Sequence, residues 1–259
     1  MNLIELNRSL VQLRLSGMAA VMETRLLQAQ SENMAPIDLI STLVSDELAC
    51  RSKRLLERRH KQAQFRDADK RLDNFDFQFN ARMNRNLVFE LATANWIGKR
   101  EDALFLGPSG TGKTHLAIAL GTEAIVAANT VYFLTIQDLV AQFQRARDEN
   151  KLKERMTLLV KPKLLILDEM GYLSLDPFAA TCLFQLVSER YEKGSIILTS
   201  NKSYGDWGAI FADNVIASAI LDRLLHHSTT INIKGESCQL KDKKKAGAVA
   251  AKLPGKEGG

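Results

Sequence analysis

Few cysteines and no long apolar run limit the classes to which this 259-residue sequence can belong. Its three cysteines, Cys50, Cys182 and Cys238, are odd in number and widely spaced, a pattern that predicts neither a disulfide framework nor a metal cluster. No window approaches the roughly 18 apolar residues of a membrane span, and residues 1–5 do not resemble a signal peptide. We therefore expect a cytoplasmic protein that makes no membrane contact.

The composition is otherwise that of a soluble globular protein. Hydrophobic residues make up 46% and charged residues 25% of the chain. The net charge of +5 is modest, so charge that serves a function has to be concentrated locally. The length suits one large domain or a domain with an extension.

A glycine-rich segment near the middle of the chain fits the phosphate-loop pattern G-x-x-x-x-G-K-[ST]. It consists of Gly107, Pro108, Ser109, Gly110, Thr111, Gly112, Lys113 and Thr114. Glycines let the backbone bend so that successive N–H groups point at phosphate oxygens. Lys113 adds a positive charge toward the β- and γ-phosphates, and the Thr114 hydroxyl is placed to bind Mg²⁺. Because a strand-like run precedes the loop and a helical pattern follows it, we expect a nucleoside triphosphate site and not an ordinary turn.

Two carboxylates, Asp168 and Glu169, follow the apolar run 164–167. Ligands collect at the carboxyl ends of the strands in open α/β sheets, so both acids are expected beside the phosphate loop. Asp168 would hold Mg²⁺, and Glu169 would orient and deprotonate a water for attack on the γ-phosphate. Nucleotide kinases do not require this glutamate, so the pair favours hydrolysis. The alternative is a pair that caps the turn after the strand.

Two more polar residues are candidates for the same site. Asn201 follows a predicted strand and is placed to hold the attacking water or the γ-phosphate, although an asparagine after a strand is usually a turn residue. Arg223 is a cation in an otherwise apolar helix. It is either a surface residue paired with Asp222 or an arginine finger that acts on the γ-phosphate of the next subunit. The second interpretation requires an oligomer.

Residues 1–68 show helical spacing throughout. Gly17 offers a break between the first two helices, and Pro36 suits the first turn of a third. One apolar face is expected on this third helix, formed by Leu39, Ile40, Leu43, Val44 and Leu48.

The continuation of the third helix is strongly basic. Glu57 alone opposes the seven cations Arg51, Lys53, Arg54, Arg58, Arg59, Lys61 and Arg66. A solvated helix face is the usual explanation of such a run. Because the chain also has an ATPase signature and a pI near 9.1, we favour binding to the nucleic-acid backbone through the first six of these cations.

After residue 68 the pattern alternates between strands and helices, which predicts an α/β fold with a parallel sheet and crossover helices. Strands are expected at 103–106, 130–134, 163–167, 195–199 and 229–233, and helices near 84–98, 137–160, 177–191 and 215–225. Three aromatic residues, Phe75, Phe77 and Trp96, either border the adenine or belong to the core. We divide the chain into a helical domain (1–68), an ATPase domain (69–240) and a basic, disordered tail (241–259).

Four segments, taken in order, resemble the family of IstB-like ATP-binding proteins, the helper ATPases of bacterial insertion-sequence transposition. They read GPSGTGKTHLAIALG, LLILDEMGYLSLDP, FQLVSERYEKGSIILTSNKSYGDWG and AILDRLLHHSTTINIKGES. The resemblance covers nearly the whole chain and weakens after about residue 240. The phosphate loop is shared with many ATPases, whereas the second and third segments are far more specific.

The resemblance implies an AAA+ P-loop NTPase, a three-layer α/β/α domain with a five-stranded parallel sheet, preceded by a small all-helical domain. Such a protein uses ATP and Mg²⁺, forms a homo-oligomer on double-stranded DNA, remodels it and assists a cognate transposase. Lys113 and Thr114 would contact the nucleotide and metal, Asp168 and Glu169 would be the metal and water-activating acids, Asn201 the sensor and Arg223 the finger. A clear second-sensor arginine is missing from the sequence.

Two other functions remain open at this point. The family is related to the DnaC helicase loaders, so the chain could serve a replicative helicase instead of a transposase. It could also be an ATP-gated DNA-binding module in which hydrolysis is incidental.

Overall fold

The computed structural model describes residues 2–78, 83–211 and 213–233. The chain forms two compact units, Met1–Arg59 and His60–Gly259, and each is described by itself. The limits predicted at residues 68 and 240 stay predictions. The basic tail at 241–259, Cys238 and Phe79 lie outside the described residues.

Three helices make up the first unit: α1 (Leu3–Gln12), α2 (Ser16–Ser31) and the greater part of α3 (Pro36–Ala63). Leu10, Met22 and Leu43 form its small core. Asn2 and Glu5 cap α1 through reciprocal side-chain-to-backbone hydrogen bonds. Pro36 begins α3, as the sequence predicts, because its fixed φ and missing N–H suit the first helical position.

Gly17 is not the break between the first two helices. α1 ends at Gln12 and α2 begins at Ser16, so Gly17 lies in the first turn of α2. Its role is close packing, because an added Cβ would lie 2.7 Å from Cys50 Cβ. The Glu47 carboxylate accepts hydrogen bonds from the N–H groups of Gly17 and Met18, at 2.6 and 3.0 Å, and thereby caps α2 from the side of α3.

The apolar face expected on α3 is only partly buried. Leu43 is buried, but Ile40, Val44 and Leu48 are 53%, 44% and 59% exposed. Leu39 and Leu43 pack against apolar residues of α1 and α2 on a different side of the helix. Helical spacing shows which residues share a face but not how much of the circumference the neighbouring helices cover.

A five-stranded parallel sheet in the order β2-β3-β4-β1-β5 forms the centre of the second unit. Its strands are β1 (Asp102–Leu106), β2 (Val131–Thr135), β3 (Leu164–Met170), β4 (Ser195–Ser200) and β5 (Ser228–Asn232). All five predicted strands are present. β3 extends farther than predicted and includes Asp168 and Glu169, with an irregularity in its pairing to β4 between Leu167 and Met170.

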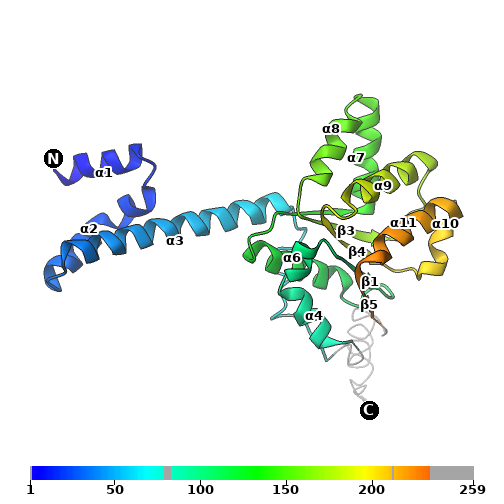
Figure 1. Cartoon of the computed structure of the whole chain (residues 1–259), viewed down its shortest axis with the longest axis horizontal. Helices are drawn as coiled ribbons and strands as arrows, with labels where there is room; N and C mark the ends of the chain where they lie inside the picture. Colours follow the sequence, from blue (N-terminus) through cyan, green and yellow to red (C-terminus); the bar gives the residue numbers. More distant parts are fainter. Residues whose placement is uncertain (1, 79–82, 212, 234–259) are drawn as a thin grey trace, which may run out of the picture. The chain divides into compact units, whose positions relative to one another are not determined.

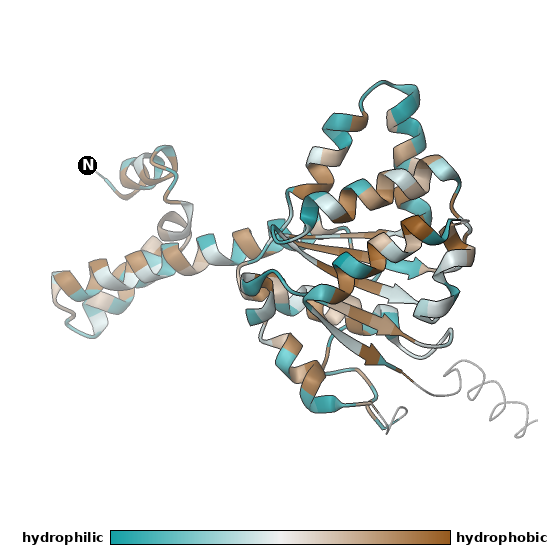
Figure 2. Cartoon of the chain, turned by 45° about the vertical axis from the view of Figure 1, so that its right-hand side comes forward, coloured by the Kyte–Doolittle hydropathy of each residue, from teal (hydrophilic) through white to brown (hydrophobic). Residues whose placement is uncertain are grey.

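Helices cover both faces of this sheet, which gives three layers (Figure 1). They are α4 (Arg85–Ala92), α5 (Asn95–Lys99), α6 (Lys113–Val126), α7 (Ile136–Asp148), α8 (Leu152–Val160), α9 (Pro177–Arg190), α10 (Trp207–Phe211), α11 (Asn214–His226) and the 3₁₀ turn η1 (Tyr204–Asp206). Leu165 and Leu167 pack with residues of α7, α9 and α11, whereas Ile166 lies against Gly121 of α6. Figure 2 shows hydrophobic strands between helices with hydrophilic outer sides. The predicted α/β fold class is confirmed.

Two helical predictions need correction. The helix expected at 84–98 is divided into α4 and α5, because Ala94 between them adopts a left-handed conformation with φ of +57°. The segment 204–211 was not predicted to be helical, yet it forms η1 and α10 and buries Trp207 completely. Both features depend on tertiary packing, which local periodicity does not report.

Candidate nucleotide site

Parallel strands bring the predicted nucleotide residues to one edge of the sheet. β1 leads directly into the loop 107–112, and the loop leads into α6. β3 and β4 end at the same edge, because β1 pairs with β4 and β4 pairs with β3 in parallel register. The phosphate loop, Asp168, Glu169 and Asn201 are therefore grouped by topology, as the sequence predicts.

Three glycines of the loop have backbone conformations that side chains rarely adopt. Gly107, Gly110 and Gly112 have φ of +152°, +75° and +89°. An added Cβ would lie 2.2 Å from the Ile233 carbonyl oxygen at Gly107 and 2.7 Å from the Phe75 ring at Gly112. Glycine at these two positions is thus required by both conformation and space, and the loop is left with the open backbone that phosphate binding needs.

Lys113 is the first residue of α6 and is buried. Its Nζ donates hydrogen bonds of 2.7 Å to the carbonyl oxygens of Gly107 and Pro108. Burial lowers the pKa of Lys113, and the nearby Asp168 partly offsets this effect. Among the described residues no carboxylate pairs directly with Lys113, so its charge is available to a triphosphate in the loop.

Asp168 is completely buried and lies next to Thr114. Its Oδ1 accepts hydrogen bonds from the hydroxyl groups of Thr114, at 3.0 Å, and Thr199. Its Oδ2 is buried and has no hydrogen-bond partner among the described residues. An unpartnered carboxylate oxygen beside a threonine hydroxyl fits Mg²⁺, which is usually bound by one or two protein oxygens together with phosphates and water.

No group of three or more His, Cys, Asp or Glu residues suited to a metal ion exists in the described ranges. Mg²⁺ that binds together with nucleotide phosphates needs only one or two protein oxygens. Thr114 and Asp168 are the residues that could hold it.

Glu169 has a strained backbone and a half-exposed side chain. Its φ is +66°, and its N–H donates to the Thr199 hydroxyl at 3.0 Å. Its Oε2 lies 3.6 Å from Nη1 of Arg66, and its side chain is 43% exposed. Thr199 therefore contacts both acids, a role that sequence reasoning missed, because Thr199 reaches them only through the pairing of β4 with β3.

A cleft of about 530 Å³ opens over these groups. The loop residues Ser109 to Thr114 line it together with Glu169, Thr199 and Tyr172, and the segment that precedes α4 supplies Arg66, Lys70, Asn74, Phe75 and Asp76. The phosphate loop therefore lines one part of the cleft, and a segment that carries the aromatic ring of Phe75 lines another.

Of the three aromatic residues considered for the adenine, Phe75 lines this cleft. Trp96 is buried in the core, where its Nε1 donates to the Leu91 carbonyl oxygen at 2.8 Å. Phe77 stacks on Phe89, with 5.6 Å between the ring centroids. His115, which the sequence analysis did not single out, fixes the segment beside Phe75: its Nε2 lies 2.8 Å from the Arg71 carbonyl oxygen and 3.0 Å from Asn74 Oδ1.

Asn201 follows β4 and lies against the end of β3. Its N–H donates to the Met170 carbonyl oxygen at 3.3 Å. Its Oδ1 is buried without a hydrogen-bond partner in the described part of the chain, and an added Cβ on Gly171 would lie 2.4 Å from it. Asn201 contacts the end of the strand that carries both acids but is not among the residues that line the cleft. Its role as a sensor stays a prediction.

Arg223 is not brought to the phosphate loop of its own chain. Its guanidinium lies 4.7 Å from the centre of the Phe184 ring, and its Nη1 donates to the Ala219 carbonyl oxygen at 3.0 Å. It borders a small cavity with Asp102 and Ile196, near the amino ends of β1 and β4. This is the sheet edge opposite the nucleotide residues, so a finger role requires a second subunit.

The six cations proposed to contact DNA fall into two groups. Arg51 Nε pairs with Glu47 at 2.7 Å and holds the pKa of that carboxyl below its usual value, and Arg54 donates to the Ser16 hydroxyl. These two arginines connect the helices of the first unit. Within the described residues no ion pair or hydrogen bond engages the side chains of the other four, Lys53, Arg58, Arg59 and Lys61.

Comparison with known families gives a match over most of the chain. The family described as IstB-like ATP binding protein matches residues 8–246. A protein of Pseudomonas aeruginosa named "Insertion sequence IS21 putative ATP-binding protein" is 44% identical over 245 residues, 95% of this chain and 92% of that protein. "Insertion sequence IS5376 putative ATP-binding protein" of Geobacillus stearothermophilus is 52% identical over 175 residues, 68% of this chain and 70% of that protein.

Solved structures share the fold of the second unit. AMPPCP-bound DnaA from Aquifex aeolicus has a TM-score of 0.55 and 22% identity, and the match covers 74% of this chain and 59% of that one. The crystal structure of DnaI has a TM-score of 0.54 and 19% identity, over 70% of this chain and 98% of that one. At these identities the likeness concerns the AAA+ P-loop fold. Among the described helices, none is long and apolar enough to span a membrane.

Proposed function

Because the chain belongs to the family of IstB-like ATP-binding proteins, we propose that it hydrolyses ATP and, as a homo-oligomer on double-stranded DNA in the bacterial cytoplasm, assists the transposase of an insertion sequence. The observation that supports hydrolysis most directly is the set of contacts around Asp168 and Glu169. Thr114 and Thr199 hold the buried Asp168 beside the loop, and Thr199 also fixes the backbone of Glu169.

In this proposal Glu169 is the general base. Its carboxylate accepts a proton from a water whose oxygen attacks the γ-phosphorus, while the bond from that phosphorus to the β,γ-bridging oxygen breaks. The products are ADP and inorganic phosphate. Lys113 neutralises charge on the phosphoryl oxygens, and the buried amide of Asn201 is available to hold the water or a γ-phosphate oxygen.

When bound, Mg²⁺ would neutralise negative charge on the nucleotide phosphates. The residues that would hold it are Thr114 and Asp168, because the free Oδ2 of Asp168 is buried beside the Thr114 hydroxyl. Phe75 is the residue that we assign to the adenine side of the cleft.

DNA binding is supported by the unpartnered cations of α3 and by the names of the relatives, which place them in insertion sequences. A DNA backbone is recognised by such cations without base specificity, through release of counterions. ATP-dependent assembly would gather many copies of this basic helix on one duplex. ATP hydrolysis at the phosphate loop of each copy would then determine how long the assembly stays on the DNA.

A direct test measures binding to a random-sequence duplex with ATP, with ADP and without nucleotide, at several salt concentrations. We expect tight binding with ATP and a steep loss of affinity with salt. Binding that is indifferent to both nucleotide and salt would refute the proposal.

Glu169→Gln separates hydrolysis from ATP-gated binding. The variant should bind ATP and DNA, lose hydrolysis and fail to release DNA, since glutamine cannot accept the proton. If the variant supports transposition at the normal level, hydrolysis is incidental. Capture of the transposase in a pull-down is expected, and capture of a hexameric helicase alone would instead indicate a helicase loader.

A further inference from the structure

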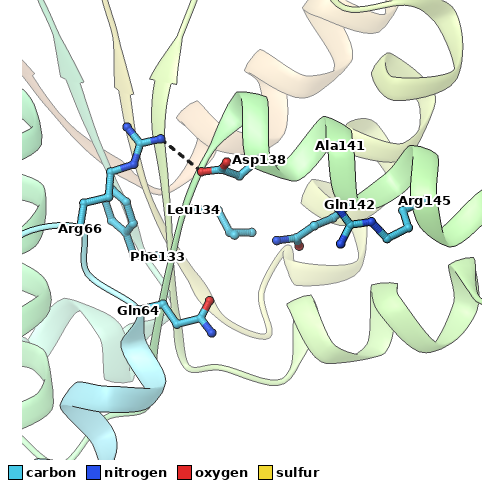
Figure 3. A pocket seen from close by; sticks show the side chains of 8 residues that line it. All are labelled: Gln64, Arg66, Phe133, Leu134, Asp138, Ala141, Gln142 and Arg145. Atoms are coloured by element: carbon cyan, nitrogen blue, oxygen red, sulfur yellow. Dashed lines mark hydrogen bonds and ion pairs between the residues drawn. The ribbon is translucent and has the colours of Figure 1, made fainter.

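Arg66 lies between two carboxylates at the edge of the nucleotide cleft. It is the third residue after the end of α3. Its Nη1 is 3.6 Å from Glu169 Oε2, and its Nη2 is 3.3 Å from Asp138 Oδ2 and 3.5 Å from the Thr135 hydroxyl oxygen. Figure 3 shows the guanidinium of Arg66 pointing toward Asp138 of α7 across the end of β2.

Asp138 is itself held firmly. The Thr135 hydroxyl donates to Asp138 Oδ2 at 2.6 Å, and the Asp138 N–H donates back to the Thr135 hydroxyl oxygen at 3.1 Å. Thr135 caps α7 and ends β2, where it pairs in register with Asp168 of β3. The anchor of Arg66 is thus built on the same strand edge as the metal-binding carboxylate that we propose.

The side chain of Glu169 is fixed by fewer contacts than that of Asp138. Its backbone N–H is fixed by Thr199, but its carboxylate is 43% exposed, and Arg66 provides its only ion pair in the described part of the chain. A general base has to be held within a few tenths of an ångström of its working position, because small misplacements lower catalytic rates strongly. A carboxylate on a rotatable side chain at a cleft needs a second contact.

We propose that Arg66 is a positioning residue for Glu169, connecting its carboxylate through Asp138 to the N-terminus of α7. The inference rests on the proposed role of Glu169 in hydrolysis and adds a residue that neither the motif nor the family pattern assigns. The planar guanidinium suits this role because its two terminal nitrogens serve two acceptors at once, which a lysine ammonium on its flexible stem does less well.

The charge around Arg66 argues against a primary role in binding the triphosphate. One cation is shared between two carboxylates, so it offers little net positive charge to phosphates. Lys113 and Lys70 also line the cleft, and Lys113 has no direct carboxylate partner among the described residues. Removal of Arg66 should therefore change turnover and leave nucleotide affinity nearly unchanged.

The main test compares Arg66→Ala, Arg66→Lys and a matched control, Arg145→Ala. Arg145, on α7, lines a second pocket beside the nucleotide cleft together with Arg66 and Asp138 (Figure 3), is exposed, and forms no ion pair within the described ranges. We expect Arg66→Ala to lower kcat about tenfold or more, with KM and the Kd of a fluorescent ADP analogue within about twofold of the parent protein. Arg66→Lys should recover part of kcat, and Arg145→Ala should behave as the parent.

Asp138→Asn tests the anchor. Since asparagine keeps the cap of α7 but loses the charge, this variant should lower kcat in the same way as Arg66→Ala, though less strongly. The double variant should be no slower than Arg66→Ala, because both changes remove one connected contact. If the two substitutions lower kcat additively, Arg66 and Asp138 do not act through one connected contact with Glu169.

The outcomes separate this inference from the proposed function. If Glu169→Gln abolishes hydrolysis and Arg66→Ala has the parent kcat, the positioning role is refuted while the role of Glu169 stands. If Arg66→Ala raises Kd for the nucleotide with kcat unchanged, Arg66 binds phosphate and the inference is also overturned. If Glu169→Gln hydrolyses ATP normally, the proposed function itself fails.

Discussion

At the scale of single residues, Lys113 is buried, and its ammonium group has only neutral hydrogen-bond acceptors as direct partners among the described residues. Its ammonium group donates to two loop carbonyl oxygens, which are neutral acceptors, so a triphosphate that replaces them gains a full charge–charge contact. Burial also lowers the pKa of Lys113, because the neutral carbonyl groups of the loop and the nearby Asp168 offset the desolvation of its charge only in part.

Lys113→Ala should therefore abolish ATP binding without unfolding the protein. Calorimetric titration with ATP and Mg²⁺ measures the effect directly. Lys99→Ala, which removes an exposed lysine from α5, is the matched control. Unchanged ATP affinity of the Lys113 variant would contradict the assignment of the loop.

Asp102, at the amino end of β1, is a partly buried acid with a structural role. Burial raises its pKa to about 7, against the opposing effects of the Ile196 N–H, which donates to Asp102 Oδ1 at 2.7 Å, and of the nearby Arg190. The folded state therefore keeps its proton at pH values where the unfolded chain has released it. The contribution of Asp102 to the free energy of unfolding therefore falls as pH rises from about 4 to about 7. Above about pH 7 this contribution no longer changes with pH.

Asp102→Asn should remove this part of the pH dependence, because asparagine keeps the acceptor for Ile196 and has no charge to bury. We expect the variant to gain stability relative to the parent as pH rises from 5 to about 7, with a slope of at most about 1.4 kcal/mol per pH unit, and little further between pH 7 and 8. Urea unfolding at pH 5, 6, 7 and 8 measures the difference. A difference that is the same at every pH would show that Asp102 does not titrate in this range.

From the sequence alone, candidate site residues could be identified where the motif is contiguous, but not where their position depends on strand pairing. The phosphate loop, Asp168 and Glu169 could be recognised because each set of residues is contiguous and follows a strand-like run. Thr199 and Arg66 reach the same cleft from distant segments, and His115, directly after the loop, contacts Arg71 and Asn74 from a segment much earlier in the chain. Strand register and loop packing decide their positions, and a single sequence contains no local mark of either.

At the scale of elements, α3 has two parts that differ in their contacts. Its residues near position 50 connect the helices of the first unit, and the cations farther along have no partners among the described residues. A substitution at Arg51 or Arg54 therefore tests folding as much as DNA binding. Arg58 and Arg59 are the better positions for a test of DNA contact.

Reversing Arg58 and Arg59 to glutamate should weaken duplex binding about tenfold or more and reduce its dependence on salt concentration, equally for different sequences. ATP binding should remain that of the parent. Lys153→Glu with Lys193→Glu makes the same charge change on exposed residues of the second unit and serves as control. Equal losses in both double variants would show that net charge, and not α3, determines the affinity.

The elements themselves were largely predictable, but their burial was not. The five strands and the helices after the phosphate loop follow from apolar runs and helical spacing. The exposed stripe of α3 and the left-handed Ala94 between α4 and α5 could not be predicted, because both depend on which neighbours cover a surface. Periodicity describes one element at a time.

At the scale of the whole molecule, the residues proposed for the site lie at two edges of the sheet. The loop, the acids and Asn201 lie at the carboxyl edge, and Arg223 lies near the amino edge, against Phe184. One chain cannot place Arg223 on its own γ-phosphate without refolding. A subunit that presents this edge to the next subunit's loop would complete the site, so the assembly and the active site would form together.

Mixing two inactive variants tests this arrangement more sharply than either alone. Arg223→Ala should bind ATP with the parent affinity and hydrolyse it poorly, whereas Lys113→Ala should not bind ATP but keeps an intact Arg223. Mixed oligomers contain interfaces in which an intact loop from the first variant meets an intact arginine from the second, so ATPase activity should partly return on mixing, in the presence of duplex DNA. The same mixture made with Lys113→Ala/Arg223→Ala as the second protein lacks the donor arginine and should stay inactive. Full activity of Arg223→Ala by itself, or no recovery in the first mixture, would exclude a finger supplied by the neighbouring subunit.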